Sequence, residues 1–458
     1  MSGLEDPGAA AVFIALILVG IAMYIIKWAC DSFEPASDYL GTEVYNLAPG
    51  VRGASINAVA SSLPELFTTL FLLFFFHDED GFAAGIATCA GSAIFNGAVI
   101  PALCIIAVST KGVNGEIVTE IQLRRATLAR DGFFFLFAEI VFIFFLNSST
   151  LSWWMGLVLM LIYVCYAVVL IKTPSEDDDD DDDDGDSVSN PMKRVQSSDD
   201  EKGDVEEEGG AAMVEGEGDG AADGEGGGDV EEDEKGGDGD GDGDDDDDDE
   251  KPTFFQALIT FDVNELIYDG ADFASSGQAW TVLLISTLII AAACYVLAEA
   301  VMLSAKGFGV APYFTAVILG AAASSVPDTY ISYMDALKGD YDDAVANAIG
   351  SNIFDICFAL GLPLFLYGLI YGDVDMMAEL GSQGGGSEKE ASEVQSLRIL
   401  LIIASIVMLM IFFINKTGVD DKGRAYQIVG KPQAYMLFGL YAIWTLIIIL
   451  QAAEVISF

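Results

Sequence analysis

Two short stretches place an acid directly after a proline inside otherwise apolar sequence. The first is AVASSLPELF, residues 58 to 67, which contains Glu65, and the second is AAASSVPDTY, residues 321 to 330, which contains Asp328. An ionised side chain inside a membrane-spanning helix costs about 2.5 to 3.5 kcal/mol on insertion scales, so it normally faces a partner or a polar cavity. Both carboxylates are therefore expected to have a positive partner.

The prolines of these stretches suggest what that partner is. Pro64 and Pro327 lack an N–H group and displace the carbonyl four residues earlier, at Ala60 and Ala323. Freed carbonyls inside a bilayer need another positive group. A bound cation satisfies the carboxylates and the carbonyls together.

Each half of the chain then adds a second polar motif on the next apolar run. In GSAIFN, Ser92 and Asn96 are four residues apart, as are Ser351 and Asp355 in GSNIFD, so each pair shares one helix face. Hydroxyl, amide and carboxylate oxygens are hard ligands, which suit calcium, sodium or potassium better than zinc or copper. Each motif alone is more typical of a kink or of helix packing. All four in mirrored order predict an oxygen-lined cation site.

The elements that position these residues are predicted to be membrane-spanning helices. The chain is 52% hydrophobic, and apolar runs near the length of about 20 residues that crosses a bilayer occur about ten times. These runs centre on residues 8–28, 51–76, 82–108, 127–147, 152–172, 279–303, 308–336, 342–371, 397–415 and 434–455.

The acidic residues divide the chain into three parts. Of its 71 acidic residues, 37 lie within residues 173–252, which have too little apolar surface to fold and are predicted to form a disordered loop. About five spans are expected in each of the flanking parts, 1–172 and 253–458, and an odd number inverts the second part in the membrane. The predicted fold is an all-α polytopic membrane protein built from two inverted five-helix repeats, with the ion site at the midplane.

Basic residues predict the orientation of this bundle. Cytoplasmic loops carry an excess of Lys and Arg. With the N-terminus outside, the two basic loops and the acidic loop are cytoplasmic, and both termini are outside. The basic residues concerned are Lys111, Arg124, Arg125, Arg130, Lys416, Lys422, Arg424 and Lys431.

At these motifs the sequence resembles the sodium/calcium exchangers and, within that superfamily, the potassium-dependent branch. The segments NAVASSLPELFTTL and GIATCAGSAIFNGAV resemble the first family repeat, and VILGAAASSVPDTY and NAIGSNIFDICFALGLP resemble the second. The resemblance implies a secondary active antiporter that exchanges sodium for calcium by alternating access. It implies no enzyme activity and no cofactor, and its partners are the transported ions and the lipid bilayer, without nucleic acid.

The resemblance also assigns roles to individual residues. Glu65 and Asp328 correspond to the central calcium ligands that sodium also uses, with Ser61 and Ser324 beside them. The remaining sodium or potassium ligands correspond to Ala58, Ser62, Ser92, Asn96, Ala321, Ser325, Ser351 and Asp355. An aspartate at Asp355 goes with potassium co-transport in the resembling branch, and three carboxylates, Glu65, Asp328 and Asp355, balance one divalent and one monovalent cation.

Several alternatives remain open at this point. A potassium-independent or proton-coupled exchanger of the same fold would use the same carboxylates. An intramembrane aspartyl protease would need Tyr-Asp and Gly-x-Gly-Asp motifs within spans, which are missing, and the acidic loop alone would bind calcium weakly. Asp31 and Glu299 are expected only to line an ion path, and Glu139 has no assigned role.

Overall fold

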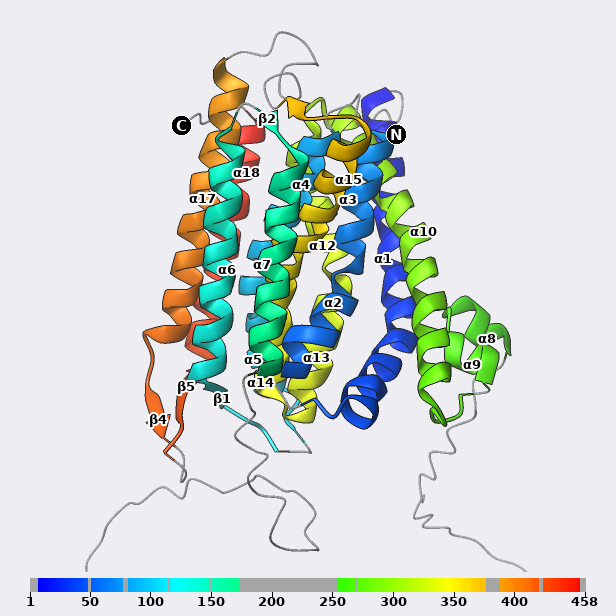
Figure 1. Ribbon diagram of the computed structural model, residues 1–458, viewed down its shortest axis with the longest axis vertical. Helices are drawn as coiled ribbons and strands as arrows, with labels where there is room; N and C mark the ends of the chain where they lie inside the picture. The colour runs from blue at the N-terminus through cyan, green and yellow to red at the C-terminus, as the bar shows by residue number, and fades with distance from the viewer. Residues whose placement is uncertain are drawn as a thin grey trace, which may run out of the picture. The chain divides into compact units, whose positions relative to one another are not determined.

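The computed structural model describes residues 7–47, 51–76, 81–113, 116–148, 150–172, 254–268, 270–375, 388–419 and 423–453 (Figure 1). The first part contains α1 (Pro7–Tyr39), η1 (Leu40–Val44), η2 (Gly53–Asn57), α2 (Ala58–Ser61), α3 (Leu63–Phe75), α4 (Gly81–Ile94), η4 (Phe95–Val99), α5 (Ile100–Val108), β1 (Glu120–Arg124), α6 (Arg125–Leu146), β2 (Thr150–Leu151) and α7 (Trp153–Lys172), where η marks a π-helical turn.

The last part has the same order of long elements. It contains α8 (Phe254–Ile259), α9 (Val263–Tyr268), α10 (Ser276–Phe308), α11 (Pro312–Thr315), η5 (Ala316–Gly320), α12 (Ala321–Ser324), α13 (Val326–Lys338), α14 (Tyr341–Phe354), η6 (Asp355–Ala359), α15 (Gly361–Ile370), β3 (Val374–Asp375), α17 (Glu388–Phe413), β4 (Thr417–Val419), β5 (Ala425–Gly430) and α18 (Lys431–Ala452). The predicted loop at 173–252 lies outside the described residues.

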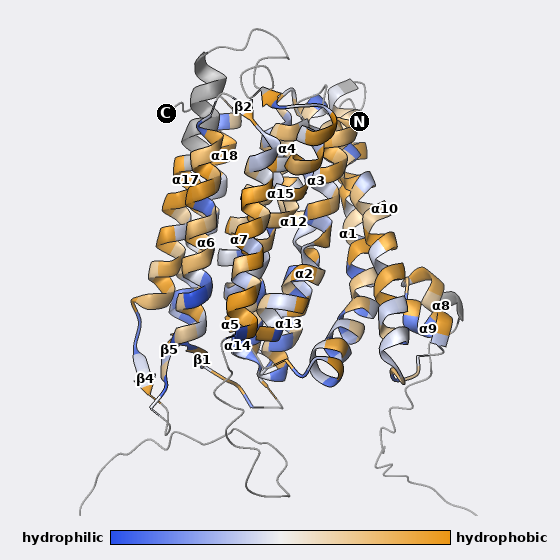
Figure 2. Ribbon diagram, in the orientation of Figure 1, coloured by the Kyte–Doolittle hydropathy of each residue, from blue (hydrophilic) through white to orange (hydrophobic). Residues whose placement is uncertain are grey.

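Most residues of the long helices are hydrophobic, as the orange ribbons of Figure 2 show, and many of their apolar side chains are exposed. Phe144 on α6, Ile171 on α7 and Leu284 on α10 are more than 60% exposed. Such surfaces are stable in lipid and costly in water. Among the described residues, six helices are long and apolar enough to cross a membrane, or seven if the bent pair Gly53–Ser61 and Leu63–Phe75 is one span. The chain is therefore a polytopic helical membrane protein.

The other three expected spans are helical but fail that length and composition test. The helix at 127–147 carries Arg130, Asp131 and Glu139, and the one at 308–336 is interrupted at Ser325. The described apolar part of the helix at 397–415 is short, from Ile399 to Phe413. The number of ten spans stays a prediction.

Helices α1 and α10 run antiparallel side by side (Figure 1). The end of α10 at Gly307 lies against Gly8 and Val12 at the start of α1. At the other end, the Ser32 hydroxyl donates to the carboxylate of Asp262, which is the residue directly before α9. We call the end of the bundle where α7 ends and α8 begins the connector end; α1 begins and α18 ends at the opposite end (Figure 1).

Two helices are interrupted at the motifs that carry the acids. The breaks fall at Ser62 and Ser325, where ψ is 7° and 10°, and each following helix has proline as its second residue. Proline is tolerated there because the first turn of a helix has no use for its N–H group. Glu65 consequently lies in the first turn of α3, where the helix dipole favours a negative charge.

The expectation of an all-α fold needs one correction, because the chain also forms two small antiparallel sheets. β1 pairs with β5, which pairs with β4, at the connector end, and β2 pairs with β3 at the opposite end (Figure 1). In β1 the residues alternate between exposed and buried, with Ile121 and Leu123 buried. This period of two favours a strand, although the segment is too short to stand out in sequence.

Glycines allow the central helices to approach closely. A Cβ atom on Gly91 would lie 2.1 Å from the carbonyl oxygen of Val317 and 2.6 Å from Cβ of Ala321. A Cβ atom on Gly350, the first residue of the other GS motif, would lie 2.9 Å from Cα of Ala54. The two motif glycines therefore place α4 against η5 and α14 against η2.

We expect Gly91→Ala to destabilise the protein, because the obstructing atom is a backbone oxygen that cannot move alone. The cost expected for overpacking is about 1 to 3 kcal/mol. Thermal unfolding in detergent measures it, with Gly439→Ala as the control, because no atom lies within 4 Å of a Cβ at that helical glycine. Equal melting temperatures for both variants would contradict this account of the packing.

Candidate cation site

Three carboxylates lie in the middle of the helix bundle. Glu65 on α3, Asp328 on α13 and Asp355 at the start of η6 are each fully buried. They come from the two proline motifs and from the second GS motif, so the structure brings together acids that are far apart in sequence. Burying three carboxylates in an apolar bundle is unfavourable unless their charges are balanced.

The Ser92 hydroxyl of α4 connects two of these acids. Its Oγ lies 3.2 Å from Glu65 Oε1 and 3.0 Å from Asp355 Oδ2. It also lies 2.9 Å from the Ser325 hydroxyl, which donates to Glu65 Oε1 at 3.2 Å. A hydroxyl has one hydrogen to donate. Ser92 therefore cannot satisfy both carboxylates at once.

Asp328 is held by donors from both parts of the chain. The Asn96 amide donates to Asp328 Oδ2 at 2.9 Å and to Ser92 Oγ at 3.1 Å. The Ser351 hydroxyl donates to Asp328 Oδ1 at 2.6 Å and lies 3.3 Å from the Ser61 hydroxyl. Asn96 thus joins the Asp328 carboxylate to the Ser92 hydroxyl.

These polar contacts leave negative charge uncompensated. Glu65 Oε2, Asn96 Oδ1 and Asp355 Oδ1 are buried without a hydrogen-bond partner among the described residues. The basic residues Arg52 and Lys27 are paired with other acids, Asp343 and Asp31. Carboxylate and amide oxygens that lack a hydrogen donor are suited to a hard cation.

Acidic side chains alone do not form a metal site in the described part of the chain. Within the described ranges, no group of three or more His, Cys, Asp or Glu side chains is placed to hold one metal ion. The hydroxyls of Ser92 and Ser325 and the amide nitrogen of Asn96 lie between the three carboxylates. An ion here would be coordinated by a mixed set of oxygens, as the sequence predicts.

The remaining predicted ligands occupy less direct positions. The carbonyl of Ala58 accepts from the Ser62 N–H at 3.2 Å, and that of Ala321 accepts from the Ser325 N–H at 3.1 Å. Ser324 donates to the Ala321 carbonyl at 3.2 Å. These carbonyls already accept hydrogen bonds, so their use by an ion stays a prediction. Ser61, Ser62 and Ser324 are fully buried in the same region.

Sequence reasoning missed Asn347. Its amide donates to the Asp328 carbonyl at 3.3 Å and to Ser332 Oγ at 2.9 Å, and its oxygen accepts from Ser61 at 3.3 Å. Asn347 is four residues before Ser351, on the same face of α14. Extending the four-residue spacing of the GS motif by one step toward the N-terminus would have found it.

The acids without a sequence-based role lie outside this cluster of contacts. Glu139 is fully buried and accepts from Ser405 at 3.0 Å. Glu299 accepts from the Tyr295 hydroxyl at 3.1 Å on the exposed side of α10, and Asp31 pairs with Lys27 at 2.5 Å.

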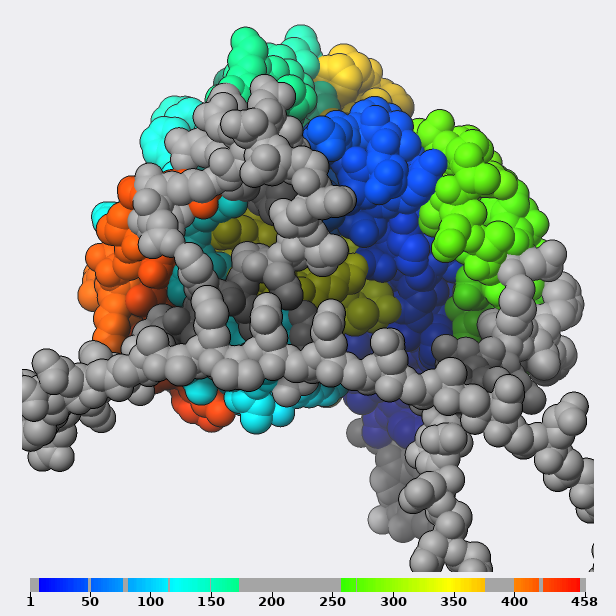
Figure 3. All heavy atoms as spheres, turned by 90° about the horizontal axis from the view of Figure 1, so that it is seen from below, coloured from blue at the N-terminus to red at the C-terminus, as the bar shows by residue number. Residues whose placement is uncertain are grey.

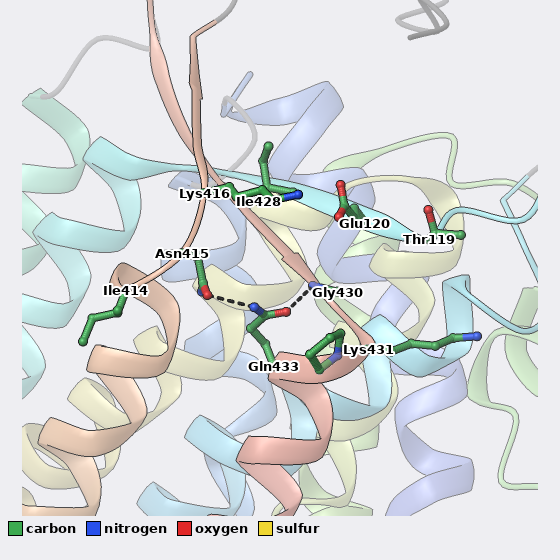
Figure 4. Close-up of a pocket in the computed structure, with 10 residues that line it drawn as sticks. Thr119, Glu120, Ile414, Asn415, Lys416, Ile428, Gly430, Lys431 and Gln433 are labelled. Atoms are coloured by element: carbon green, nitrogen blue, oxygen red, sulfur yellow. Dashed lines mark hydrogen bonds between the residues drawn. The ribbon is translucent and has the colours of Figure 1, made fainter. Parts of the chain in front are cut away.

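A surface cavity of about 530 Å³ at the connector end is separate from these residues (Figure 4). The Gln433 amide crosses it, donating to Asn415 Oδ1 at 2.8 Å and accepting from the Gly430 N–H at 2.9 Å. None of the predicted ligands lines this cavity. The candidate cation site is therefore an enclosed cluster of oxygens.

An apolar helical bundle around a buried, oxygen-lined acidic centre defines a polytopic membrane protein with a candidate site for hard cations. The family model described as sodium/calcium exchanger protein matches residues 14–172 and 278–450. The chain belongs to this family.

Individual relatives are similar over shorter segments. The Homo sapiens sodium/potassium/calcium exchanger 3 is 33% identical over 165 residues, which cover 36% of this chain and 23% of the relative. The Mus musculus sodium/potassium/calcium exchanger 4 is 34% identical over 144 residues, covering 31% of this chain and 21% of the relative. The chain thus matches less than a quarter of the length of these relatives.

Among solved structures, the sodium-calcium exchanger NCX_Mj, soaked with sodium and strontium, aligns with 94% of this chain and 97% of its own. The sequence identity is 15% and the TM-score is 0.48.

We expect Ser92→Ala to lower stability by about 1 to 3 kcal/mol, because it leaves buried acceptors without their donor. Ser304→Ala is the matched control, since Ser304 is also fully buried but donates only to a helix carbonyl, that of Val301. Thermal unfolding of both variants in the same detergent gives the comparison. A Ser92→Ala loss no larger than that of the control would show that Ser92 does not hold the acids together.

Proposed function

We propose that this chain is a secondary active antiporter that exchanges sodium for calcium at the buried carboxylates, with potassium co-transport. One observation carries the proposal: Glu65, Asp328 and Asp355 are fully buried, and hydroxyl and amide groups rather than basic side chains contact them. Membership in the exchanger family and the names of its relatives support the choice of ions.

A shared site accounts for exchange. Sodium and calcium compete for the oxygens of Glu65 and Asp328, so the two ions occupy the centre in turn. An empty centre is unfavourable because its carboxylates repel one another inside the bundle. The loaded site switches its access from one side of the membrane to the other more readily than the empty site does. Movement of one ion species is therefore coupled to movement of the other in the opposite direction.

We further propose that the bundle is two inverted five-helix repeats. The order of helices, breaks and π-helical turns in the first part recurs in the last part, and α1 runs antiparallel to α10. Inverted repeats support alternating access, in which one half moves against the other around a midplane site. In the predicted orientation the connector end, the two basic loops and the acidic loop are cytoplasmic, and both termini are outside.

Asp355 is the proposed basis of potassium co-transport. The corresponding residue of the first part is Asn96, so the second part contributes one extra negative charge to the centre. Three carboxylates balance one calcium and one potassium ion together. The Asp355 contact with Ser92, which also contacts Glu65, supports a potassium ion bound next to calcium.

The central prediction is that Glu65→Gln and Asp328→Asn each reduce calcium flux below about a tenth of the wild-type rate, because each removes charge at the ion. Uptake of calcium-45 into proteoliposomes, driven by an outward sodium gradient, measures it. Glu120→Gln is the control, as Glu120 is an exposed carboxylate on β1 at the connector end. Wild-type flux in either central variant would exclude the shared site.

Potassium dependence is a separate prediction. Wild-type uptake should need potassium, and Asp355→Asn should transport calcium equally with or without potassium, because one negative charge fewer leaves no need for the second cation. The same vesicles with potassium or choline salts provide the measurement. Uptake by the wild type that ignores potassium would place the chain in a potassium-independent branch, and uptake driven by a pH gradient without sodium would identify a proton-coupled exchanger.

A further inference from the structure

Arg52 forms a buried ion pair between the two parts of the chain at the connector end. It lies just before η2, and its guanidinium donates to Asp343 Oδ2 of α14 from Nη2 at 2.5 Å and from Nε at 3.1 Å. Asp343 is fully buried and Arg52 is 9% exposed. Arg52 also lies 3.1 Å from Asp38 and 3.6 Å from Asp340. One basic side chain is thus surrounded by three acids.

This ion pair ends a line of polar residues that leads to the candidate cation site. Asp343, Asn347 and Ser351 on α14 and Asp355 at the start of η6 follow one another at four-residue steps and are all fully buried. Residues at this spacing lie on one helix face. Such a line in a membrane-spanning helix provides oxygens along the whole distance from the connector end to the central acids.

The facing helix, α13, continues the same polar line. Ser332 accepts from Asn347 at 2.9 Å, and Asp335 lies about one turn further toward the connector end. Asp335 is 2% exposed, and its Oδ2 has no partner among the described residues. Asp335 is also close enough to Arg52 and Asp343 for their charges to interact. Figure 3, which views the molecule from this end, shows olive atoms in the colour range of α13 and α14 recessed beside blue atoms of the N-terminal part of the chain.

Among the described residues, the positions that correspond to Arg52 and Asp343 at the opposite end form no ion pair. The matching motifs show which residues correspond in the two parts of the chain. Glu65 and Asp328 are 263 residues apart, so Arg52 corresponds to Thr315. Ser92 and Ser351 are 259 residues apart, so Asp343 corresponds to Ala84. Thr315 is uncharged and donates to a helix carbonyl, that of Val301, at 3.1 Å. The ionic contact is therefore specific to one end of two otherwise similar arrangements.

We propose that Arg52 is a positioning residue that closes the connector end of the ion path. The guanidinium acts as a tethered cation: it occupies Asp343 and joins the two parts of the chain while the path is closed. It leaves Asp343 when the path opens, and an ion passing along α14 takes its place beside Asp343. This proposal rests on the proposed exchange function, but the labelling experiment below tests closure without transport.

Thiol labelling tests closure without transport. In a chain whose six native cysteines are replaced, Asp335→Cys supplies a buried thiol on α13, within range of the charge of Arg52. A membrane-impermeant maleimide applied from the connector end should label it at least about tenfold faster after Arg52→Gln, because the open state becomes more populated. Arg124→Gln is the control, as Arg124 pairs with Asp342, the neighbour of Asp343, at the same end.

The charge swap Arg52→Asp with Asp343→Arg should restore slow labelling, which a merely damaged fold would not do. If Arg52→Gln does not accumulate, the swap and Arg52→Lys supply the comparison. Lysine keeps the charge but loses the two-pronged contact, so labelling should be intermediate. Equal labelling rates in the parent, Arg52→Gln and Arg124→Gln, or rapid labelling of the folded swap variant, would overturn the proposal.

Transport provides a second readout. Calcium transport is measured in two sets of vesicles in which the protein is inserted in opposite orientations. Arg52→Gln should lower the apparent Michaelis constant for calcium at the connector end and raise it at the opposite end. The ratio of the two constants should change by about fivefold or more. An unchanged ratio in an active variant contradicts closure by Arg52. A wild-type protein that transports no calcium refutes the proposed function instead, and the labelling result still decides the role of Arg52.

Discussion

The structure depends on three carboxylates that are buried together and that no basic side chain contacts within the described part of the chain. Glu65, Asp328 and Asp355 lie inside a bundle whose exterior is apolar, where an uncompensated charge is very unfavourable. The hydroxyls of Ser92, Ser325 and Ser351 and the amide of Asn96 orient these carboxylates but bring no positive charge. Balance must come from bound cations or protons. Under the proposed function, the centre is most stable when a cation is bound.

The helix breaks and the glycines serve this constraint. The interruptions at Ser62 and Ser325 place Glu65 and Asp328 in first turns, where helix dipoles favour negative charge. Gly91 and Gly350 let neighbouring helices approach closely enough for one hydroxyl to contact groups from both parts of the chain. Local backbone geometry thus determines which oxygens can face one ion. Arg52 adds an ionic restraint at the connector end, and the corresponding residues of the other part, Thr315 and Ala84, are uncharged.

Sequence could predict the acids and much of their setting, because proline, acid and serine inside apolar runs are unusual enough to be noticed. Ser92, Asn96, Ser351 and Asp355 followed from spacing alone. The contacts across the two parts, such as Asn96 with Asp328, could not be predicted, because they depend on how the helices pack. Asn347 was missed because it looks like an ordinary polar residue in the sequence. Arg52 was missed because a charged residue at the start of a span is not unusual. The pairing of β1 with β5 was missed because each strand is too short for a clear period.

The most direct test of this account is equilibrium binding rather than flux. Purified protein in detergent is titrated with calcium-45, first without sodium and then at rising sodium concentration. Competition for the same carboxylates predicts saturable calcium binding whose apparent affinity falls steadily as sodium increases, with no calcium bound at saturating sodium. Calcium binding of unchanged affinity at every sodium concentration would contradict the account, because the two ions would then occupy separate sites.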